Sequence, residues 1–152
     1  MKHRNFGRTG ISVSSLGLGT ATLGKQADEA ASFAILDKAT EAGMNFIYSS
    51  DFYPMNASPD EMGRSEEILG RWLKGKLGRF IIGTKAGAPV GSSNWDRGAS
   101  RKHLLDAIDG SLRRLPVFDI LSSWPRQQSY CVTITEYAHL APSQSAGLQS
   151  RG

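Results

Sequence analysis

The chain has 152 residues, of which 39% are hydrophobic and 21% charged, and its formal net charge is +4. This composition is typical of one globular domain and excludes a fully disordered chain. No apolar run approaches the roughly 18 residues of a membrane span, and the first ten residues lack the apolar core of a signal peptide. We therefore expect a cytoplasmic protein without a membrane partner.

Charge patterning and cysteine content narrow the function further. Basic residues alternate with acidic ones along the predicted helices, a pattern typical of solvated helix faces, so we expect no nucleic-acid partner. Cys131 is the single cysteine, which excludes an intramolecular disulfide and a cysteine metal cluster. A nicotinamide dinucleotide phosphate would also be attracted by positive charge, so the net charge does not discriminate.

The amino-terminal part reads as a hairpin, a strand and a helix. Two alternating runs within residues 3–18 flank a turn with glycines at 7 and 10, which predicts a small β-hairpin. Apolar residues separated by glycines at 16–19 indicate a tightly packed strand. Residues 28–43 predict an amphipathic helix in which Asp28 is the N-cap and Gly43 ends the helix.

Two further strand–helix pairs follow. A strand at 45–49 precedes a polar loop and a helix at 64–74, and an apolar strand at 79–85 ends in a lysine. Ser100 is predicted to cap a helix over 101–115. Its expected buried stripe consists of Leu104, Leu105, Ile108, Leu112 and Leu115. Three successive strand–helix pairs indicate a parallel sheet with right-handed crossovers.

After Leu115 the composition changes. Residues 116–152 contain only four charged side chains and no lysine, and neither the helical nor the strand period continues beyond 118–121. The sequence predicts no fourth helix there. We expect the segment 121–152 to be a divergent, partly disordered tail.

Five stretches in order carry a family resemblance. They are RNFGRTGISVSSLGLGT at 4–20, EAGMNFIYSSDFYP at 41–54, GRSEEILGRWLKG at 63–75, FIIGTKAG at 80–87 and SRKHLL…GSLRRL at 100–115. Over about residues 1–115 the chain resembles the amino-terminal part of the aldo-keto reductases. The resemblance implies an α/β fold, namely the N-terminal half of a (β/α)8 TIM barrel preceded by a β-hairpin, with residues 1–120 forming a partial reductase domain.

The resemblance also implies catalytic positions. The family reduces a carbonyl with NADPH, using a Tyr as proton donor, a Lys and an Asp that tune it, and a His that positions the carbonyl. Tyr53 and Lys85 stand at the Tyr and Lys positions. Tyr48 replaces the Asp, and Trp124 stands near the expected His. The alternatives are a loop aromatic at Tyr53 and a surface lysine at 85.

The cofactor positions transfer only in part. Gly19, Thr20 and Ala21 match the backbone that passes beneath the nicotinamide, although a tight strand exit explains them equally well. The family's phosphate pocket comes from the second half of the barrel, so we expect weak NADPH binding. His3, His103 and His139 are interpreted as structural or surface residues.

Two functional hypotheses follow. In the first, the chain is a truncated or frame-shifted piece of an NADPH-dependent reductase of small-molecule carbonyl substrates, without activity of its own. In the second, it is a non-catalytic half-barrel that binds a ligand or self-associates through its open sheet edges. The sequence names no substrate.

Overall fold

The computed structural model describes residues 1–116, 119–123 and 131–133. It begins with an antiparallel hairpin of β1 (His3–Asn5) and β2 (Ser12–Ser14). Gly7 and Gly10 both have positive φ in the connecting turn, a conformation that glycine adopts without steric cost. The predicted hairpin is therefore confirmed.

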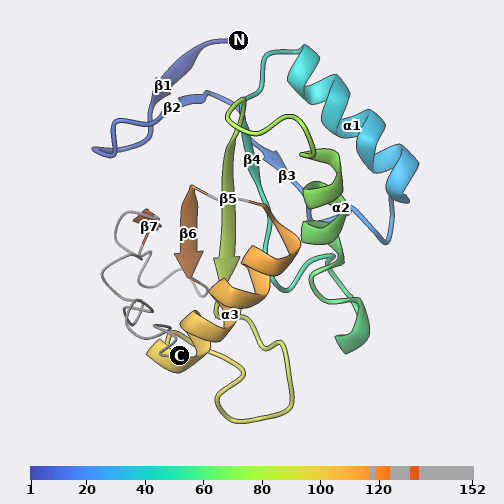
Figure 1. Cartoon of the computed structure of the whole chain (residues 1–152), viewed down its shortest axis with the longest axis vertical. Helices are drawn as coiled ribbons and strands as arrows, with labels where there is room; N and C mark the ends of the chain where they lie inside the picture. Colours follow the sequence, from blue (N-terminus) through green and yellow to red (C-terminus); the bar gives the residue numbers. More distant parts are fainter. Residues whose placement is uncertain (117–118, 124–130, 134–152) are drawn as a thin grey trace, which may run out of the picture.

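A five-stranded sheet forms the centre of the molecule (Figure 1). Its strands, in spatial order, are β3 (Leu18–Gly19), β4 (Phe46–Tyr48), β5 (Ile81–Ala86), β6 (Ile120–Ser123) and β7 (Cys131–Thr133). The pairs β3–β4 and β4–β5 are parallel, as predicted. The pair β5–β6 is also parallel, whereas β6 and β7 are antiparallel. A fourth parallel strand is thus present, and it continues three residues past the end of the predicted domain at 120.

Three α-helices pack on one side of this sheet: α1 (Glu29–Glu41), α2 (Arg64–Trp72) and α3 (Arg101–Arg114) (Figure 1). A short 3-10 helix, η1 (Pro59–Glu61), precedes α2. The side chain of Asp28 accepts the amide N–H of Ala31, and that of Ser100 accepts the amide N–H of His103. Both predicted N-caps are confirmed.

The core lies between the sheet and the three helices. Its buried residues are Leu23, Leu36, Ile47, Leu69, Trp72, Leu73, Ile82, Ala86, Ala107, Ile108 and Leu115. The predicted burial of Leu112 is wrong, because this side chain is 41% exposed beside the outer hollow between α2 and α3. Ile35 is also 41% exposed, since it projects about 100° around the helix from the fully buried Leu36.

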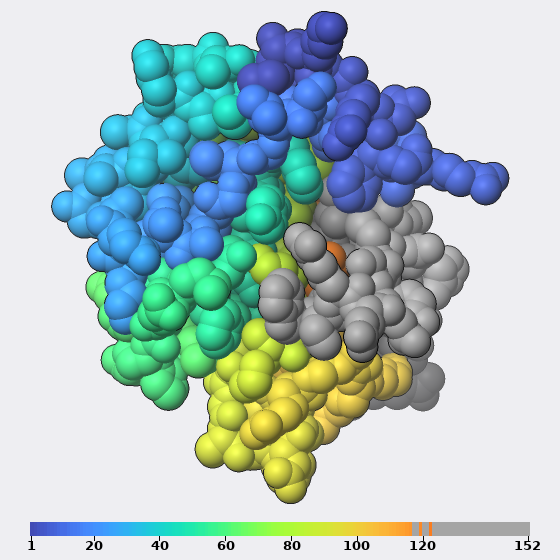
Figure 2. Space-filling view, turned by 180° about the vertical axis from the view of Figure 1, so that it is seen from behind, coloured from blue at the N-terminus to red at the C-terminus, as the bar shows by residue number. Residues whose placement is uncertain are grey.

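The hairpin and the loop at 87–99 lie at opposite ends of the sheet, as Figure 1 and the reverse view in Figure 2 show. The ring centroids of Phe6 and Phe46 are 5.7 Å apart, which ties the hairpin to the start of β4. The carboxyl ends of β4 and β5 meet at the other end, where α/β barrels place their functional residues. In the described part of the chain, no helix is long and apolar enough to cross a membrane.

Candidate functional site

A mostly apolar cavity of about 270 Å³ opens where the loops after β4 and β5 meet. Its lining residues are Ser50, Phe52, Tyr53, Met55, Lys85, Ala88 and Pro89. Tyr53 comes from the first loop and Lys85 from β5. The structure therefore brings the two predicted catalytic residues into one cavity, which we call the lysine cavity.

Lys85 is held by a carbonyl oxygen and two aromatic rings. Its Nζ donates to the backbone oxygen of Ser49 at 3.1 Å. The same nitrogen lies 3.7 Å from the ring centroid of Tyr53 and 4.9 Å from that of Tyr48. Such contacts with aromatic faces stabilise an ammonium. Within the described residues Lys85 forms no salt bridge, so Tyr48 supplies a ring where the family resemblance places a carboxylate.

The pKa of Lys85 reflects this environment. Burial lowers it to about 8, and the charges of Asp51 and Glu66 act in the opposite direction. Desolvation disfavours the charged form of an amine. The charges of Asp51 and Glu66 offset this effect only in part, and no salt bridge to Lys85 occurs among the described residues. A substantial fraction of Lys85 is therefore a neutral amine in mildly alkaline solution.

Tyr53 is buried, with 9% of its surface exposed. Burial raises the pKa of its phenol, and Tyr48 raises it further. Lys85 lies over the face of the Tyr53 ring. A phenol that ionises easily would need a lowered pKa. The pKa of Tyr53 is raised instead, so Tyr53 stays protonated at neutral pH.

The three predicted cofactor residues lie at the carboxyl end of β3. The hydroxyl of Thr20 is buried and donates to Ser49 Oγ at 2.8 Å, and the oxygen of Ala21 accepts the amide of Met55 at 2.8 Å. A Cβ on Gly19 would lie 3.2 Å from the Tyr48 ring, which shows how closely that ring covers this strand. The role of these three residues beneath a nicotinamide stays a prediction.

A second cavity of about 270 Å³ has a polar wall and lies against α3. Asp51 and His103 line it together with Asp96, Asp106 and Arg113. We call it the aspartate cavity. Asp51 is 5% exposed and His103 3% exposed, and among the described residues Asp51 Oδ2 and His103 Nε2 have no hydrogen-bond partner. Asp51 thus lines the aspartate cavity and not the lysine cavity, although it lies only two residues before Tyr53 in the chain.

Burial dominates both pKa values in the aspartate cavity. It raises the pKa of Asp51 to about 7, with a further increase from the charge of Glu66, while Ser50 and Arg114 act in the opposite direction. Burial lowers the pKa of His103. Both groups therefore favour their neutral forms in the folded protein.

Glu66 holds the layers beneath these cavities together. Its Oε1 accepts the hydroxyls of Thr84 and Ser111. Its Oε2 accepts the Nε–H of Arg114 at 2.8 Å and lies 2.8 Å from Arg114 Nη2 in a salt bridge. The carboxylate is completely buried. In the sequence Glu66 is one residue of the family stretch at 63–75, and only its burial in the fold reveals this role.

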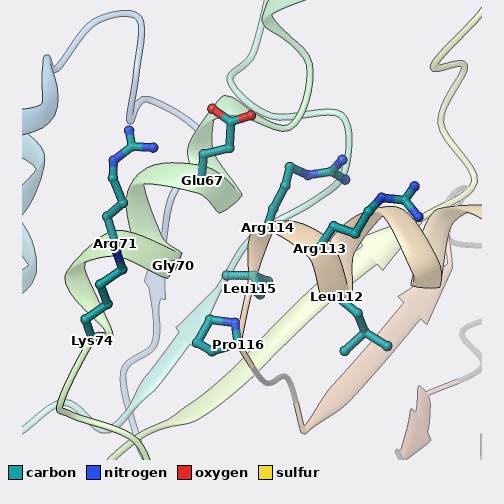
Figure 3. A pocket seen from close by; sticks show the side chains of 9 residues that line it. All are labelled: Glu67, Gly70, Arg71, Lys74, Leu112, Arg113, Arg114, Leu115 and Pro116. Carbon is teal, nitrogen blue, oxygen red and sulfur yellow. The ribbon is translucent and has the colours of Figure 1, made fainter.

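Figure 3 shows a further hollow of about 400 Å³ between α2 and α3. Arg71 reaches it from α2 and Lys74 from the turn that follows α2, and Arg113 and Arg114 reach it from α3. It lies on the helical layer, and none of its lining residues borders the lysine cavity. We therefore place the candidate site at the lysine cavity, where a phenol and an amine share an apolar wall.

Other predicted positions do not contribute to this site. His3 is exposed on the hairpin. Trp124 and His139 lie outside the described residues, as does most of the predicted tail. Among the residues that the structure describes, no group of three His, Cys, Asp or Glu side chains could hold a metal ion.

Comparisons with known proteins agree with this fold. The model of the aldo/keto reductase family matches residues 15–143. Protein tas of Escherichia coli is 34% identical over 142 residues, which cover 86% of this chain and 40% of that protein. The uncharacterized oxidoreductase YqkF of Bacillus subtilis is 34% identical over 117 residues, or 76% of this chain and 35% of that protein.

Solved structures give the same result. One described as an aldo-keto reductase from Pseudomonas aeruginosa superposes with a TM-score of 0.67 at 31% identity, covering 82% of this chain and 46% of the other. The chain belongs to the aldo/keto reductase family, a family of oxidoreductases that act on small-molecule carbonyl compounds with NAD(P)H. It spans about 40% of the length of the curated relatives, and its fold is that of part of a (β/α)8 barrel.

Proposed function

We propose that this chain binds a small carbonyl compound in the lysine cavity but does not by itself catalyse NADPH-dependent reduction. The observation that carries this proposal is the shared apolar cavity of Tyr53 and Lys85. An apolar pocket with a few polar groups is typical of small-molecule sites. A carbonyl oxygen that approaches the amine and the phenol would accept a hydrogen bond from either.

Reduction requires more than binding. A hydride acceptor needs a proton donor whose pKa is matched to the operating pH, and the pKa of Tyr53 is raised instead. Tyr48 contributes no carboxylate to hold the Lys85 ammonium. Gly19, Thr20 and Ala21 match only part of the site for NADPH, the cofactor that the family resemblance implies. These three features support binding without turnover.

The test combines a binding and a turnover measurement on the 152-residue chain. NADPH is titrated by fluorescence, and its oxidation is followed with benzaldehyde as the acceptor. We expect no oxidation above background in the chain or in its Tyr48→Asp variant, because restoring the carboxylate supplies neither a phosphate pocket nor the missing histidine. Turnover in either protein would contradict the proposal.

Binding is measured with benzyl alcohol, which has the shape of an aldehyde product and forms no covalent bond with amines. Saturation-transfer NMR should show binding, and Ala88→Trp, which fills the cavity, should abolish it. Leu112→Trp, on the outer hollow, is the matched control and should bind as the unchanged chain does. Equal binding by the chain and by Ala88→Trp would place the ligand elsewhere.

The alternative function is a non-catalytic half-barrel that pairs with a second copy. The observation that favours it is the open sheet, in which β3 pairs with β4 alone among the strands of the described residues. Unpaired strand edges promote association unless they are covered. Size-exclusion chromatography with light scattering distinguishes the two: a stable dimer favours the module, whereas a folded monomer excludes self-closure.

A further inference from the structure

Lys85 combines three features that together suit covalent chemistry. It lines an enclosed apolar cavity, it has no carboxylate partner in the described part of the chain, and its ammonium is anchored by only one hydrogen bond, to the Ser49 oxygen. A lysine desolvated in an apolar pocket is a nucleophile toward carbonyl compounds. Tyr48 stands where the family resemblance places an aspartate, so position 48 offers Lys85 an aromatic ring and no negative charge.

We propose that Lys85 forms an imine with small apolar aldehydes that enter the lysine cavity. This activity requires no nicotinamide cofactor. It rests on the carbonyl binding proposed above but not on the absence of turnover. In the family resemblance Lys85 only adjusts the acidity of the tyrosine, whereas here its own nitrogen forms a bond with the aldehyde.

The size and wall of the cavity define the aldehyde. A cavity of about 150 Å³ lined by apolar side chains holds a benzene molecule, and this one measures about 270 Å³. Phe52, Met55, Ala88 and Pro89 contribute its apolar wall. Aromatic or short branched aldehydes therefore fit, whereas a sugar aldehyde would leave its hydroxyls without partners.

The reaction balances without an added oxidant or reductant. The lone pair of the neutral Lys85 amine attacks the carbonyl carbon, and a proton moves from nitrogen to oxygen to give a carbinolamine. Loss of water then forms the C=N bond, so one aldehyde and one amine give one imine and one water. The departing hydroxyl takes up its proton from solvent water, because the raised pKa of Tyr53 makes its phenol a weak acid.

The electrostatic environment supports the first step. With a pKa of about 8, roughly a tenth of Lys85 is neutral at pH 7, against less than about 0.1% for a lysine of ordinary pKa. The nearby charges act against this: Asp51 and Glu66 favour the ammonium, and the rings of Tyr48 and Tyr53 also stabilise it. Burial outweighs them, since the pKa falls.

The experiment traps the imine. The 152-residue chain is incubated at pH 7 with benzaldehyde and cyanoborohydride, whose hydride converts the imine into a stable benzylamine, and the modified lysines are identified by peptide mass spectrometry. Lys38, whose side chain is 84% exposed, is the internal reference. We expect Lys85 to be modified about ten times faster than Lys38. Equal or slower modification of Lys85 would overturn the proposal.

Two substitutions at position 48 separate site chemistry from general reactivity. Tyr48→Asp places a carboxylate near Lys85, which should favour the ammonium and slow its modification about tenfold while Lys38 is unaffected. Tyr48→Phe adds no charge, so Lys85 should remain faster than Lys38. If both variants fold, as circular dichroism shows, and Tyr48→Asp is modified as fast as Tyr48→Phe, the proposal fails. Because no NADPH is present, the outcome is independent of the turnover test.

Discussion

The lysine cavity and the aspartate cavity are of equal size, and adjacent residues reach them, Ser50 the first and Asp51 the second. Burial drives the part-buried Lys85 of the first cavity and the buried Asp51 of the second toward their neutral forms. In the apolar cavity Lys85 retains a hydrogen-bond acceptor and two aromatic faces. In the polar cavity Asp51 has one oxygen without a partner among the described residues.

This difference indicates that the polarity of the residues lining a cavity, more than the extent of burial, decides which reaction a buried ionisable group can undergo. A neutral amine against an apolar wall is a nucleophile that an aldehyde can reach. A protonated carboxyl in a polar cavity is a hydrogen-bond donor whose ionisation weakens the fold. The following substitutions test this contrast, beginning with the group that supports both cavities.

Removing Glu66 should have the largest effect. Glu66→Ala leaves Arg114 part-buried without its carboxylate and leaves the hydroxyls of Thr84 and Ser111 without their acceptor. Breaking a buried ion pair on one side costs about 3–5 kcal/mol. Urea unfolding should show a loss of this size. Glu67→Ala, at an exposed neighbouring position, is the control, and an equal loss there would remove the special role of Glu66.

Asp51→Asn should change the pH dependence of stability. The folded pKa of Asp51, about 7, lies above its ordinary value of 3.8. As the pH rises, Asp51 therefore ionises in the unfolded chain before it ionises in the folded one. The contribution of Asp51 to stability is fully present below about pH 4 and is lost between about pH 4 and pH 7. The asparagine variant lacks this loss, which is at most about 4 kcal/mol.

The measurement is the free energy of unfolding in urea at pH 4.5 and pH 8. We expect the variant to gain stability relative to the unchanged chain at pH 8 and to gain little at pH 4.5. Asp60→Asn, at an exposed position in η1, should not alter the pH profile. Parallel profiles for the unchanged chain and Asp51→Asn would show that Asp51 ionises normally.

Narrowing the lysine cavity should reduce its chemistry with a smaller effect on stability. Ala88→Leu adds a larger side chain to a part-buried loop position, so aldehydes should modify Lys85 several-fold more slowly. We expect the unfolding free energy to change by less than about 1 kcal/mol. Modification at the original rate, measured by the trapping assay, would mean that the aldehyde reaches Lys85 by another route.

The smallest effect should reveal the coupling between the cavities. The charge of Asp51 favours the Lys85 ammonium, so Asp51→Asn should raise the trapping rate of Lys85 at pH 8 by about twofold. The rate should not change at pH 5, where Asp51 is already neutral. A decrease at pH 8 would show that the substitution acts by moving Lys85 and not through charge.

The sequence by itself determined the order of elements, two helix caps and the family. Asp28 and Ser100 cap their helices because their side chains reach amides three residues away, an interaction that depends on local spacing. The parallel pairing of β3, β4 and β5 followed from the strand–helix alternation. Tyr53 and Lys85 were predicted at adjacent strand ends, and they share a cavity.

Tertiary structure alone decided the environment of each charge. The antiparallel pairing of β7 and the exposure of Leu112 depend on neighbours distant in sequence. So do the three hydrogen bonds and the salt bridge of Glu66. The same holds for the pKa values of Lys85 and Asp51, because desolvation depends on what packs around a group and not on its neighbours in the chain. The sequence showed that a carboxylate is missing at position 48, and the fold showed that an aromatic ring lies against Lys85 instead.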